Sequence, residues 1–370
     1  MPDRAVLVLG NHADDAWSMR HYSRLLREAY ADAGVLVEYA EPDSSLSRGV
    51  SLRPLAKLIS HAENLLAFPV AVRRRARAAS VIHIADHGNG AWLLWPHLRG
   101  KTIITCHDLL AVRGARGDFP EHVPDLSEKV RQRLIVRGLR KATVIHCVSE
   151  TTARDVAAEL PEARTEVILN PLRGPFAAPR RTGSEGAKRT RGPAVIVSGA
   201  NWRKRRDFAI RAWQRLRQQP ALSGIHLHVV GPPLSDDEAS TLTAAEARAV
   251  HIESNLTDEE LAALYCRARV LLQLSRYEGF GWPIIEAQAM GTAVLCTDGP
   301  IFREVAGDGA VFIPDDLDTV DWGHVASAIG GSELPARGTA NVRRFTYEEF
   351  TGRLASLARS VASAGSMISR

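Results

Sequence analysis

Two glutamates frame a glycine-containing turn in the last third of the chain. Glu278 stands directly before Gly279 and Gly281, and seven residues separate it from Glu286. A glycine turn that leads into a helix exposes backbone N–H groups and the positive end of the helix dipole, which together favour a phosphate. A carboxylate beside a phosphate needs hydroxyl groups as partners. The pattern therefore predicts a ligand with both phosphate and polyol groups, with ribose at Glu286 and a sugar at Glu278.

Two basic residues after an earlier apolar run could balance the charge of a phosphate. Arg203 and Lys204 follow the run at 194–198, which is typical of a strand. A cation at the carboxyl end of a strand, beside a phosphate-binding turn, would stabilise a departing diphosphate. The alternative is that the basic cluster 203–206 is the solvated beginning of a helix, and this applies least to Lys204.

The sequence around the glutamates predicts a strand, a glycine turn and a short helix. Thr257 and Glu260 have the spacing of a capping box that begins a helix over 259–267, and a strand-like apolar run follows. Pro283 suits the first helical position and Gly291 suits the end of the helix. The turn therefore lies at the carboxyl end of a strand, where open α/β sheets bind their ligands.

Short apolar runs alternate with longer amphipathic stretches, which is typical of parallel strands joined by helical crossovers. We predict an α/β protein with two doubly wound, Rossmann-like domains. Strands are expected at 5–9, 35–39, 81–84, 102–106, 144–148, 166–169, 194–198, 226–230, 251–253, 270–274, 293–296 and 310–313, with helices such as 17–33 and 126–140. The expected boundaries are a first domain over 1–175, a linker rich in Gly, Pro and Arg over 176–193, a second domain over 194–345 and a closing helix over 346–370.

The composition excludes several classes of protein. The chain has 370 residues, of which 45% are hydrophobic and 24% charged, as in an ordinary globular protein. Its four cysteines are far apart, so neither a disulfide framework nor a zinc site is predicted. No apolar stretch approaches the length needed to cross a bilayer, and we expect the protein in the cytoplasm. The net charge of +5 suits anionic ligands and does not imply nucleic acid.

The segment over 275–291 resembles the signature of glycosyltransferase family 4, in which an EGFGxPxxEA loop and helix follow a strand. Trp282 stands where that family usually has Leu. Most of the chain from about residue 81 to residue 350 is similar to the family, through segments at 86–94, 105–113, 146–156, 168–172, 201–213, 231–233 and 345–361. The resemblance implies the GT-B fold, with an acceptor bound mainly by the first domain and a nucleotide sugar mainly by the second.

The resemblance also implies roles for particular residues. The implied donor-binding residues are Arg203, Lys204, Gly279, Phe280, Gly281, Trp282 and Glu286; the implied catalytic residues are His107, Glu278 and Lys204; His87 and Asp108 are implied on the acceptor side. Lys204 would contact the donor diphosphate as a point charge, with Arg203 as a weaker candidate, and His107 would face the transferred sugar. For His87 and Asp108, a buried hydrogen-bonded histidine and a loop cap are equally open interpretations.

One loop departs from the family pattern. The family's first loop usually carries a glycine pair near the donor phosphate, whereas this chain has GNHADDAWSM over 10–19. Asn11, His12 or Ser18 could supply side-chain donors instead, and the sequence leaves that choice open.

The function that the resemblance implies is that of a retaining hexosyltransferase in polysaccharide or glycoconjugate biosynthesis. It would move a sugar from a UDP- or GDP-sugar to a saccharide or lipid-linked acceptor. No cofactor or metal is expected, because Asp316 and Asp318, which formally match a DxD metal motif, lie in a stretch typical of a solvated turn. Two alternatives stay open: an epimerase or glycoside hydrolase on the same fold, and a non-catalytic GT-B scaffold. Lys204, Glu278 and Glu286 argue against the scaffold, and the acceptor-side segments argue against the other enzymes.

A basic stretch over 53–77 could contact a membrane. It combines apolar residues with Arg73, Arg74, Arg75 and Arg77. Such stretches can rest on anionic lipid. Pro69 interrupts this one, so a solvated helix end rich in arginine is the other interpretation of it. Peripheral contact with the inner face of the membrane is therefore one of two interpretations of this stretch.

Overall fold

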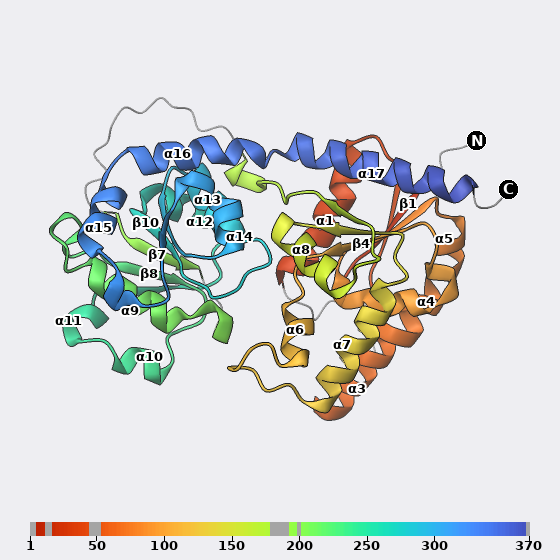
Figure 1. Ribbon diagram of the computed structural model, residues 1–370, viewed down its shortest axis with the longest axis horizontal. Helices are drawn as coiled ribbons and strands as arrows, with labels where there is room; N and C mark the ends of the chain where they lie inside the picture. The colour runs from red at the N-terminus through yellow and green to blue at the C-terminus, as the bar shows by residue number, and fades with distance from the viewer. Residues whose placement is uncertain (1–4, 12–16, 44–52, 178–191, 198–200, 368–370) are drawn as a thin grey trace. The chain divides into compact units, whose positions relative to one another are not determined.

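The expected apolar runs form two sheets in which all neighbouring strands are parallel. The computed structural model describes residues 5–11, 17–43, 53–177, 192–197 and 201–367. The chain divides into two compact units, unit 1 with residues 1–169 and 348–370 and unit 2 with residues 170–347. Each unit holds one sheet of six strands with helices around it (Figure 1). The predicted α/β class with two doubly wound sheets is confirmed.

Unit 1 is built on a sheet with the order β2-β1-β3-β4-β5-β6. Its strands are β1 (Val6–Leu9), β2 (Val37–Ala40), β3 (Val81–Ile84), β4 (Thr102–Cys106), β5 (Val144–Cys147) and β6 (Thr165–Val167). Its helices are α1 (Trp17–Asp32), α3 (Arg53–Ala62), the π-helical turn Glu63–Ala67, α4 (Phe68–Ala71), α5 (Arg73–Ala78), α6 (Leu110–Arg116), α7 (Leu126–Leu139), α8 (Glu150–Glu159) and α17 (Tyr347–Met367), with 3-10 segments at His87–Leu94 and Pro96–Leu98. The central strands are buried along their whole length because both faces of a parallel sheet are covered.

Unit 2 is built on a sheet with the order β12-β11-β10-β7-β8-β9. Its strands are β7 (Ala194–Val197), β8 (Leu227–Val230), β9 (Val250–Glu253), β10 (Val270–Gln273), β11 (Ala293–Thr297) and β12 (Val311–Ile313). Its helices are α9 (Arg206–Leu216), α10 (Asp236–Ser240), α11 (Ala244–Ala247), α12 (Asp258–Arg267), α13 (Trp282–Ala289), α14 (Pro300–Ala306), α15 (Trp322–Gly330) and α16 (Glu333–Asn341), with 3-10 turns at Gly174–Phe176, Trp202–Lys204, Pro220–Leu222, Gly307–Gly309, Leu317–Thr319 and Val342–Arg344. One apolar core, which contains Trp213 and Leu295, fills the space between sheet and helices.

The strand order reverses once in each sheet. In unit 2 the reversal lies between β7 and β10, and in unit 1 between β1 and β3. The connections after the two strands at a reversal run to opposite faces of the sheet, which leaves a crevice at their carboxyl ends. Ligand-binding residues are therefore expected directly after β7 and β10 in unit 2.

Unit 2 begins at residue 170, earlier than the boundary that the composition predicts. The amide of Leu172 donates to the carbonyl of Phe345 at 2.8 Å. Phe176, which the composition places in the linker, is buried beside Tyr265 of α12. The segment is rich in glycine, proline and arginine, so its composition does not reveal this one large apolar side chain. The burial of that side chain attaches the segment to unit 2. Most of the predicted linker, residues 178–191, lies outside the described residues.

The last helix, α17, belongs to unit 1 from residue 348 onward. Its side chains Leu354, Leu357 and Val361 are buried. Arg353 reaches Glu166 at 2.9 Å. The end of the chain therefore completes the domain that the beginning of the chain forms.

A chain of buried hydrogen bonds crosses the sheet of unit 1. His83 bonds to the hydroxyl of Tyr30 at 2.8 Å and to Thr105 at 2.9 Å, and Thr105 bonds to His146 at 3.2 Å. The Nε2 of His146 donates to the carbonyl of Ile168 at 3.0 Å. Burial lowers the pKa of His83 well below its ordinary value and lowers that of His146 to about 4. Both imidazoles are therefore neutral at pH 7.

We expect unit 1 to lose stability as the pH falls below about 6.5. The unfolded chain binds a proton on His146 near pH 6.5, whereas the folded chain binds it only near pH 4. Protonation therefore favours unfolding across that window, and His146 alone should lower the free energy of unfolding by about 2 kcal/mol between about pH 7.5 and pH 5. Urea unfolding at both pH values measures this. A His146→Gln variant should lose that part of the pH dependence, while the exposed control His324→Gln keeps it; equal pH dependence in all three proteins would contradict the assignment.

Candidate active site

The segments that carry Lys204 and Glu278 meet where the strand order of unit 2 reverses. β7 and β10 are hydrogen-bonded neighbours. The turn Trp202–Lys204 follows β7, and the loop before α13 follows β10. The amide of Arg276 in that loop donates to the carbonyl of Arg203 at 2.7 Å. Sheet topology therefore joins two segments that are far apart in the sequence.

Lys204 and Glu278 form a direct ion pair. The Nζ of Lys204 lies 2.6 Å from the Oε1 of Glu278, and the same oxygen accepts from the Nε2 of Gln273 at 3.0 Å. The Lys204 side chain is 23% exposed and that of Glu278 is 9% exposed. The ammonium is thus held in place, yet remains accessible to an incoming anion.

Helix α13 begins at the end of the same loop and supplies an anion-binding terminus. Gly281 precedes the first helical residue with a φ of 97°, a conformation that favours glycine, and a Cβ there would lie 3.1 Å from the Cδ1 of Ile284. Within the described residues, no side chain caps this terminus, as an anion site requires. Pro283 takes the second helical position, whereas the first was predicted. Gly291 follows the helix with a φ of 69°, as predicted.

Glu286 lies one turn into α13 and is only 2% exposed. The Nη2 of Arg173 lies 3.4 Å from its Oε1, and the Nη1 of Arg173 lies 3.9 Å from Asp258. Burial raises the pKa of Glu286 to about 7, although the Arg173 guanidinium opposes that shift. Burial and Glu286 together raise the pKa of the Tyr265 hydroxyl. Glu286 is therefore a buried acceptor that titrates near neutral pH.

The two aromatic residues of the loop differ in their surroundings. Phe280 is buried and meets the ring of Phe345 edge to face at 5.9 Å, so its side chain belongs to the core of unit 2. As a donor-binding residue it could act only through its backbone. The Nε1 of Trp282 donates to the carbonyl of Pro171 at 3.2 Å, and the Arg173 guanidinium lies 5.0 Å from its ring centre. Trp282 therefore ties the start of α13 to the segment that carries Arg173.

The basic cluster after β7 contains residues with separate functions. The carbonyl of Arg203 accepts from the amide of Arg276 and so holds the loop before α13. Arg206 is 5% exposed and bonds to both carboxylate oxygens of Glu238 and to the carbonyls of Pro232 and Pro233. The reading of this cluster as a solvated helix start is therefore wrong for Arg206, which anchors the turn after β8.

Asp86 is the centre of a polar cluster at the strand-order reversal of unit 1. Its Oδ2 accepts from the Nδ2 of Asn11 at 2.7 Å, and its Oδ1 accepts from the amide of Gly88 at 2.7 Å and lies 3.2 Å from the Nδ1 of His87. Burial opposes its ionisation, but His87, His107 and these donors lower the pKa of Asp86 overall. An ionised carboxylate therefore lies among the acceptor-side candidates.

His107 follows β4 and is 7% exposed. Its Nε2 donates to the carbonyl of Ala85 at 3.0 Å, and its ring meets Tyr22 edge to face at 4.5 Å. Burial lowers the pKa of His107, so the ring is neutral at pH 7 and its Nδ1 is an acceptor suited to a hydroxyl group. The Oδ1 of Asp108 accepts from the amide of Leu110 at 2.9 Å, which is the loop cap that the sequence left open.

In the first loop of unit 1, the structure describes the side chain of one of the three residues that could replace the missing glycine pair. The side chain of Asn11 is 2% exposed and is bonded to both Asp86 and Ser23. Asn11 therefore orders the loop, and its burial makes it poorly accessible to a donor phosphate. His12 and the side chain of Ser18 lie outside the described residues.

Comparison with known proteins identifies the family. A model described as Glycosyltransferase Family 4 matches residues 10–173, and a model described as Glycosyl transferases group 1 matches residues 192–329. The two models together cover most of the chain. The chain belongs to glycosyltransferase family 4.

Curated relatives of this family 4 member are similar over shorter stretches. O-antigen chain mannosyltransferase B of Escherichia coli is 37% identical over 99 residues, which is 25% of this chain and 26% of the relative. Mannosylfructose-phosphate synthase of Agrobacterium fabrum is 29% identical over 126 residues, 32% of this chain and 28% of the relative. The chain thus matches about a quarter of the length of these relatives.

Solved structures show the GT-B fold for the whole chain. Sucrose-phosphate synthase from Thermosynechococcus elongatus covers 98% of this chain and 100% of its own, with a TM-score of 0.72 and 17% identity. Anabaena HepE in complex with UDP-glucose covers 96% of this chain and 100% of its own, with a TM-score of 0.63 and 16% identity. The predicted fold is confirmed.

The aspartates of the formal DxD pattern have structural partners. Asp316 accepts from the amide of Asp318 at 3.0 Å, and the Asp318 carboxylate pairs with Arg215 at 2.5 Å. Asp318 lies in the turn Leu317–Thr319, Asp316 is the residue that caps this turn, and both are exposed. Among the residues that the structure describes, no group of three or more His, Cys, Asp or Glu side chains could hold a metal ion.

Sequence reasoning missed two residues that contact the predicted site. Arg173 lies just past the segment 168–172 that resembles the family, and nothing local links it to Glu286. Asp86 had a usable signal, because a charged residue directly after the buried strand β3 lies at the ligand-binding edge of the sheet. All the other residues predicted in unit 2 lie on the two segments at the reversal or on α13.

Proposed function

We propose that the protein is a retaining glycosyltransferase that moves a hexose from a nucleoside-diphosphate sugar to a hydroxyl group of a saccharide or lipid-linked acceptor. The observation that carries the proposal is the Lys204–Glu278 ion pair at the strand-order reversal, beside the N-terminus of α13. A cation and a helix N-terminus suit a diphosphate, and the adjacent carboxylate suits sugar hydroxyls.

In this reaction the bond between the anomeric carbon and the diphosphate breaks, and the acceptor oxygen bonds to the same face of that carbon. The acceptor proton passes to the leaving diphosphate, so atoms and charge balance. Lys204, the start of α13 and, more weakly, Arg203 stabilise the charge that grows on the diphosphate. Glu286 accepts hydroxyl groups of the ribose.

The remaining roles concern the sugar and the acceptor. Once Lys204 turns to the diphosphate, Glu278 is free to accept from sugar hydroxyls. The neutral His107 offers its Nδ1 to the transferred sugar. His87 and Asp108 stay candidates for acceptor contact, and the geometry adds Asp86 as the residue that holds His87.

The relatives support mannose as the first sugar to test, because the two curated relatives described above carry mannose-derived names. HepE in complex with UDP-glucose supports a nucleotide-sugar donor. In the described part of the chain, no helix has both the length and the apolar character needed to cross a bilayer. The cytoplasmic location of the protein stays a prediction.

A screen of UDP- and GDP-sugars by thermal shift, followed by transfer to fractionated saccharide and lipid acceptors, tests the proposal. One donor should raise the melting temperature, and product NMR should show retention at the anomeric carbon. Interconversion of the donor without an acceptor would favour an epimerase. Donor binding without transfer to any fraction would favour the non-catalytic scaffold.

We also expect transfer to continue in excess EDTA. The diphosphate charge is met in this proposal by Lys204 and the start of α13, so no divalent cation is required. Initial rates with and without the chelator measure this. Complete loss of transfer that magnesium or manganese restores would contradict it and return Asp316 and Asp318 to consideration.

A further inference from the structure

Helix α7 of unit 1 keeps an apolar stripe on the surface. Leu126, Val130 and Leu134 follow at intervals of four residues and so share one face of the helix. Their exposed fractions are 75%, 46% and 38%, and Val123 just before the helix is 90% exposed. The buried Ile135 belongs to the face that attaches α7 to the core of unit 1. The stripe is therefore not needed for folding and marks an interaction surface.

A row of cations runs beside the apolar stripe. Lys129, Arg133 and Arg137 also follow at intervals of four residues, and Arg140 extends the row. All four side chains are exposed, and within the described residues the structure records no ion pair for any of them. Like charges at this spacing destabilise a helix. An anionic partner would relieve that repulsion.

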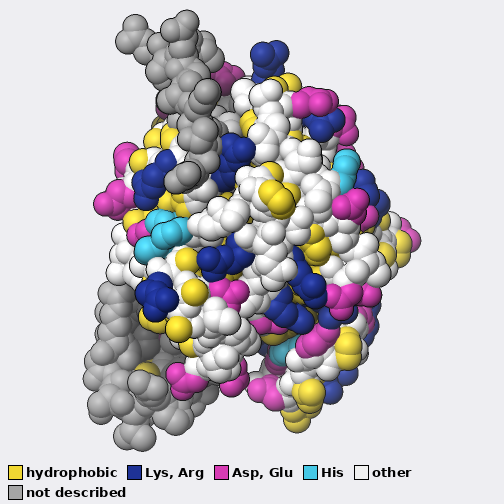
Figure 2. Space-filling view, turned by 90° about the vertical axis from the view of Figure 1, so that its left-hand side faces the viewer, with side chains coloured by type: hydrophobic (Ala, Val, Ile, Leu, Met, Phe, Trp, Pro, Cys, Tyr) yellow, Lys and Arg dark blue, Asp and Glu magenta, His cyan; other side chains and the backbone are white. Residues whose placement is uncertain are grey.

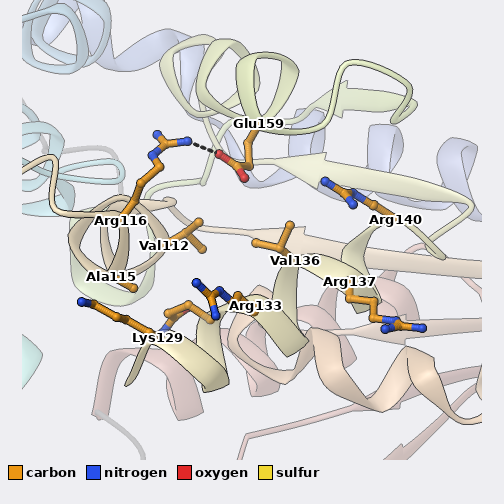
Figure 3. Close-up of a pocket in the computed structure, with 10 residues that line it drawn as sticks. Val112, Ala115, Arg116, Lys129, Arg133, Val136, Arg137, Arg140 and Glu159 are labelled. Carbon is orange, nitrogen blue, oxygen red and sulfur yellow. Dashed lines mark hydrogen bonds and ion pairs between the residues drawn. The ribbon is translucent and has the colours of Figure 1, made fainter. Parts of the chain in front are cut away.

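The row lines a cavity of about 710 Å³ between α6, α7 and the end of α8. Figure 3 shows Arg133 between Lys129 and Arg137, with Arg116 and Glu159 on the opposite side. Arg116 pairs with Glu159 at 2.6 Å, so the carboxylate in the lining is already neutralised. The cavity therefore has a strongly positive wall that is open to an anion.

We propose that this face of α7 docks the protein on a membrane rich in anionic phospholipid. We call it the α7 docking face, defined by Leu126, Val130, Leu134, Lys129, Arg133, Arg137 and Arg140. The apolar stripe would lie at the boundary between headgroups and acyl chains, while the cations meet headgroup phosphates and the cavity takes one of them. The proposal goes beyond sugar transfer and does not depend on it.

The composition of the α7 docking face favours lipid over nucleic acid and acidic protein. Its apolar members are aliphatic, whereas single-stranded nucleic acid binds surfaces with aromatic side chains for base stacking. Separate apolar and cationic rows on one helix match the layers of an anionic membrane surface. By contrast, the face shown in Figure 2 intersperses basic and acidic side chains, and its apolar side chains are scattered.

The basic stretch at 53–77 is a weaker membrane surface. Arg75 pairs with Glu38 at 2.8 Å and donates to the carbonyl of Tyr39, so part of its charge is used within unit 1. The π-helical turn Glu63–Ala67 interrupts the α-helical register of the stretch between α3 and α4. It therefore lacks one continuous helical face, which α7 has.

Flotation of the 370-residue chain with lipid vesicles tests the proposal. The protein should bind vesicles that contain about one third phosphatidylglycerol, and added salt should release it from them. It should bind vesicles of pure phosphatidylcholine weakly. Arg133→Gln/Arg137→Gln should lower the partition coefficient about thirtyfold, at about 1 kcal/mol for each residue. Val130→Ser/Leu134→Ser should lower it about tenfold or more.

A matched control removes the same charge elsewhere. Arg248 and Arg359 are exposed, and Arg248→Gln/Arg359→Gln should bind like the unmodified protein. An equal loss in this control, or equal binding to neutral vesicles, would overturn the proposal. Stabilisation by inorganic phosphate that requires Arg133 and Arg137, without vesicle binding, would assign the cavity to a free anion and also overturn it. The melting temperature of Arg133→Gln/Arg137→Gln should be unchanged or slightly higher than that of the unmodified protein, because repulsion along α7 is relieved.

Discussion

Replacing Lys204 with methionine should slow sugar transfer at saturating donor by about a hundredfold or more, while weakening donor binding much less. The Lys204 ammonium already has an anionic partner, Glu278, at 2.6 Å. Binding of a diphosphate exchanges one anion for another, so the ground state gains little. Negative charge then grows on the diphosphate as the sugar leaves, and this additional attraction lowers the barrier.

Single-turnover rates and donor dissociation constants for both proteins separate the two effects. Arg211→Met is the matched control, because Arg211 is 57% exposed on α9 and pairs with Asp207 at 3.2 Å. It should leave both quantities unchanged. Equal losses of rate and affinity in Lys204→Met would mean that Lys204 has no special role in the transition state. Unfolding curves check that Glu278, left with Gln273 as its recorded partner, does not destabilise unit 2.

Replacing Glu286 with alanine should weaken binding of the free nucleoside diphosphate about ten- to hundredfold, through loss of a charged hydrogen bond worth about 1.5–3 kcal/mol. Burial raises the pKa of Glu286 to about 7. An ionised carboxylate accepts hydroxyls more strongly than a protonated carboxyl group does, so its share of the affinity should grow by up to about tenfold from about pH 6 to pH 8. The loss of affinity caused by Glu286→Ala should therefore become smaller as the pH falls through 7.

Calorimetry with Glu286→Gln isolates this effect, because dividing the affinities of the two proteins removes the titration of the phosphate itself. The ratio should follow a single ionisation near pH 7, because the variant lacks the ionisable carboxyl group. Arg173→Met should move the midpoint upward, because the Arg173 guanidinium opposes the raised pKa of Glu286. Arg353→Met, which breaks the exposed pair with Glu166 in unit 1, should leave it unchanged. A ratio that is flat across pH would refute the ribose assignment.

The elements of both sheets could be predicted because their signals are local. Buried parallel strands need continuous apolar runs, and each expected run overlaps a strand, with ends that differ by at most two residues. The capping box at Thr257 is present in both directions, with Glu260 accepting from the Thr257 amide at 2.8 Å. Gly281 and Gly291 both have the positive φ that such turns require.

The domain boundary could not be predicted in the same way. Composition is an average over a segment and does not register a single side chain. The burial of Phe176 depends on its contact with Tyr265, nearly ninety positions later in the chain. The amphipathic stretch at 126–140 was identified as a helix, but which of its faces would stay exposed depended on how much of it the 3-10 segment His87–Leu94 covers.

The sequence by itself determined which residues are able to meet a phosphate and a polyol: Lys204, the glycine turn, Glu278 and Glu286, each through its own chemistry and its place at a strand or helix end. Only the tertiary structure decided their partners. The strand order places β7 beside β10 and so pairs Lys204 with Glu278. The packing of the segment 171–176 within unit 2 brings Arg173 to Glu286. The physical reason is that the strength of an ion pair and the pKa of a carboxyl depend on distance and burial in space, which neighbours in the sequence do not specify.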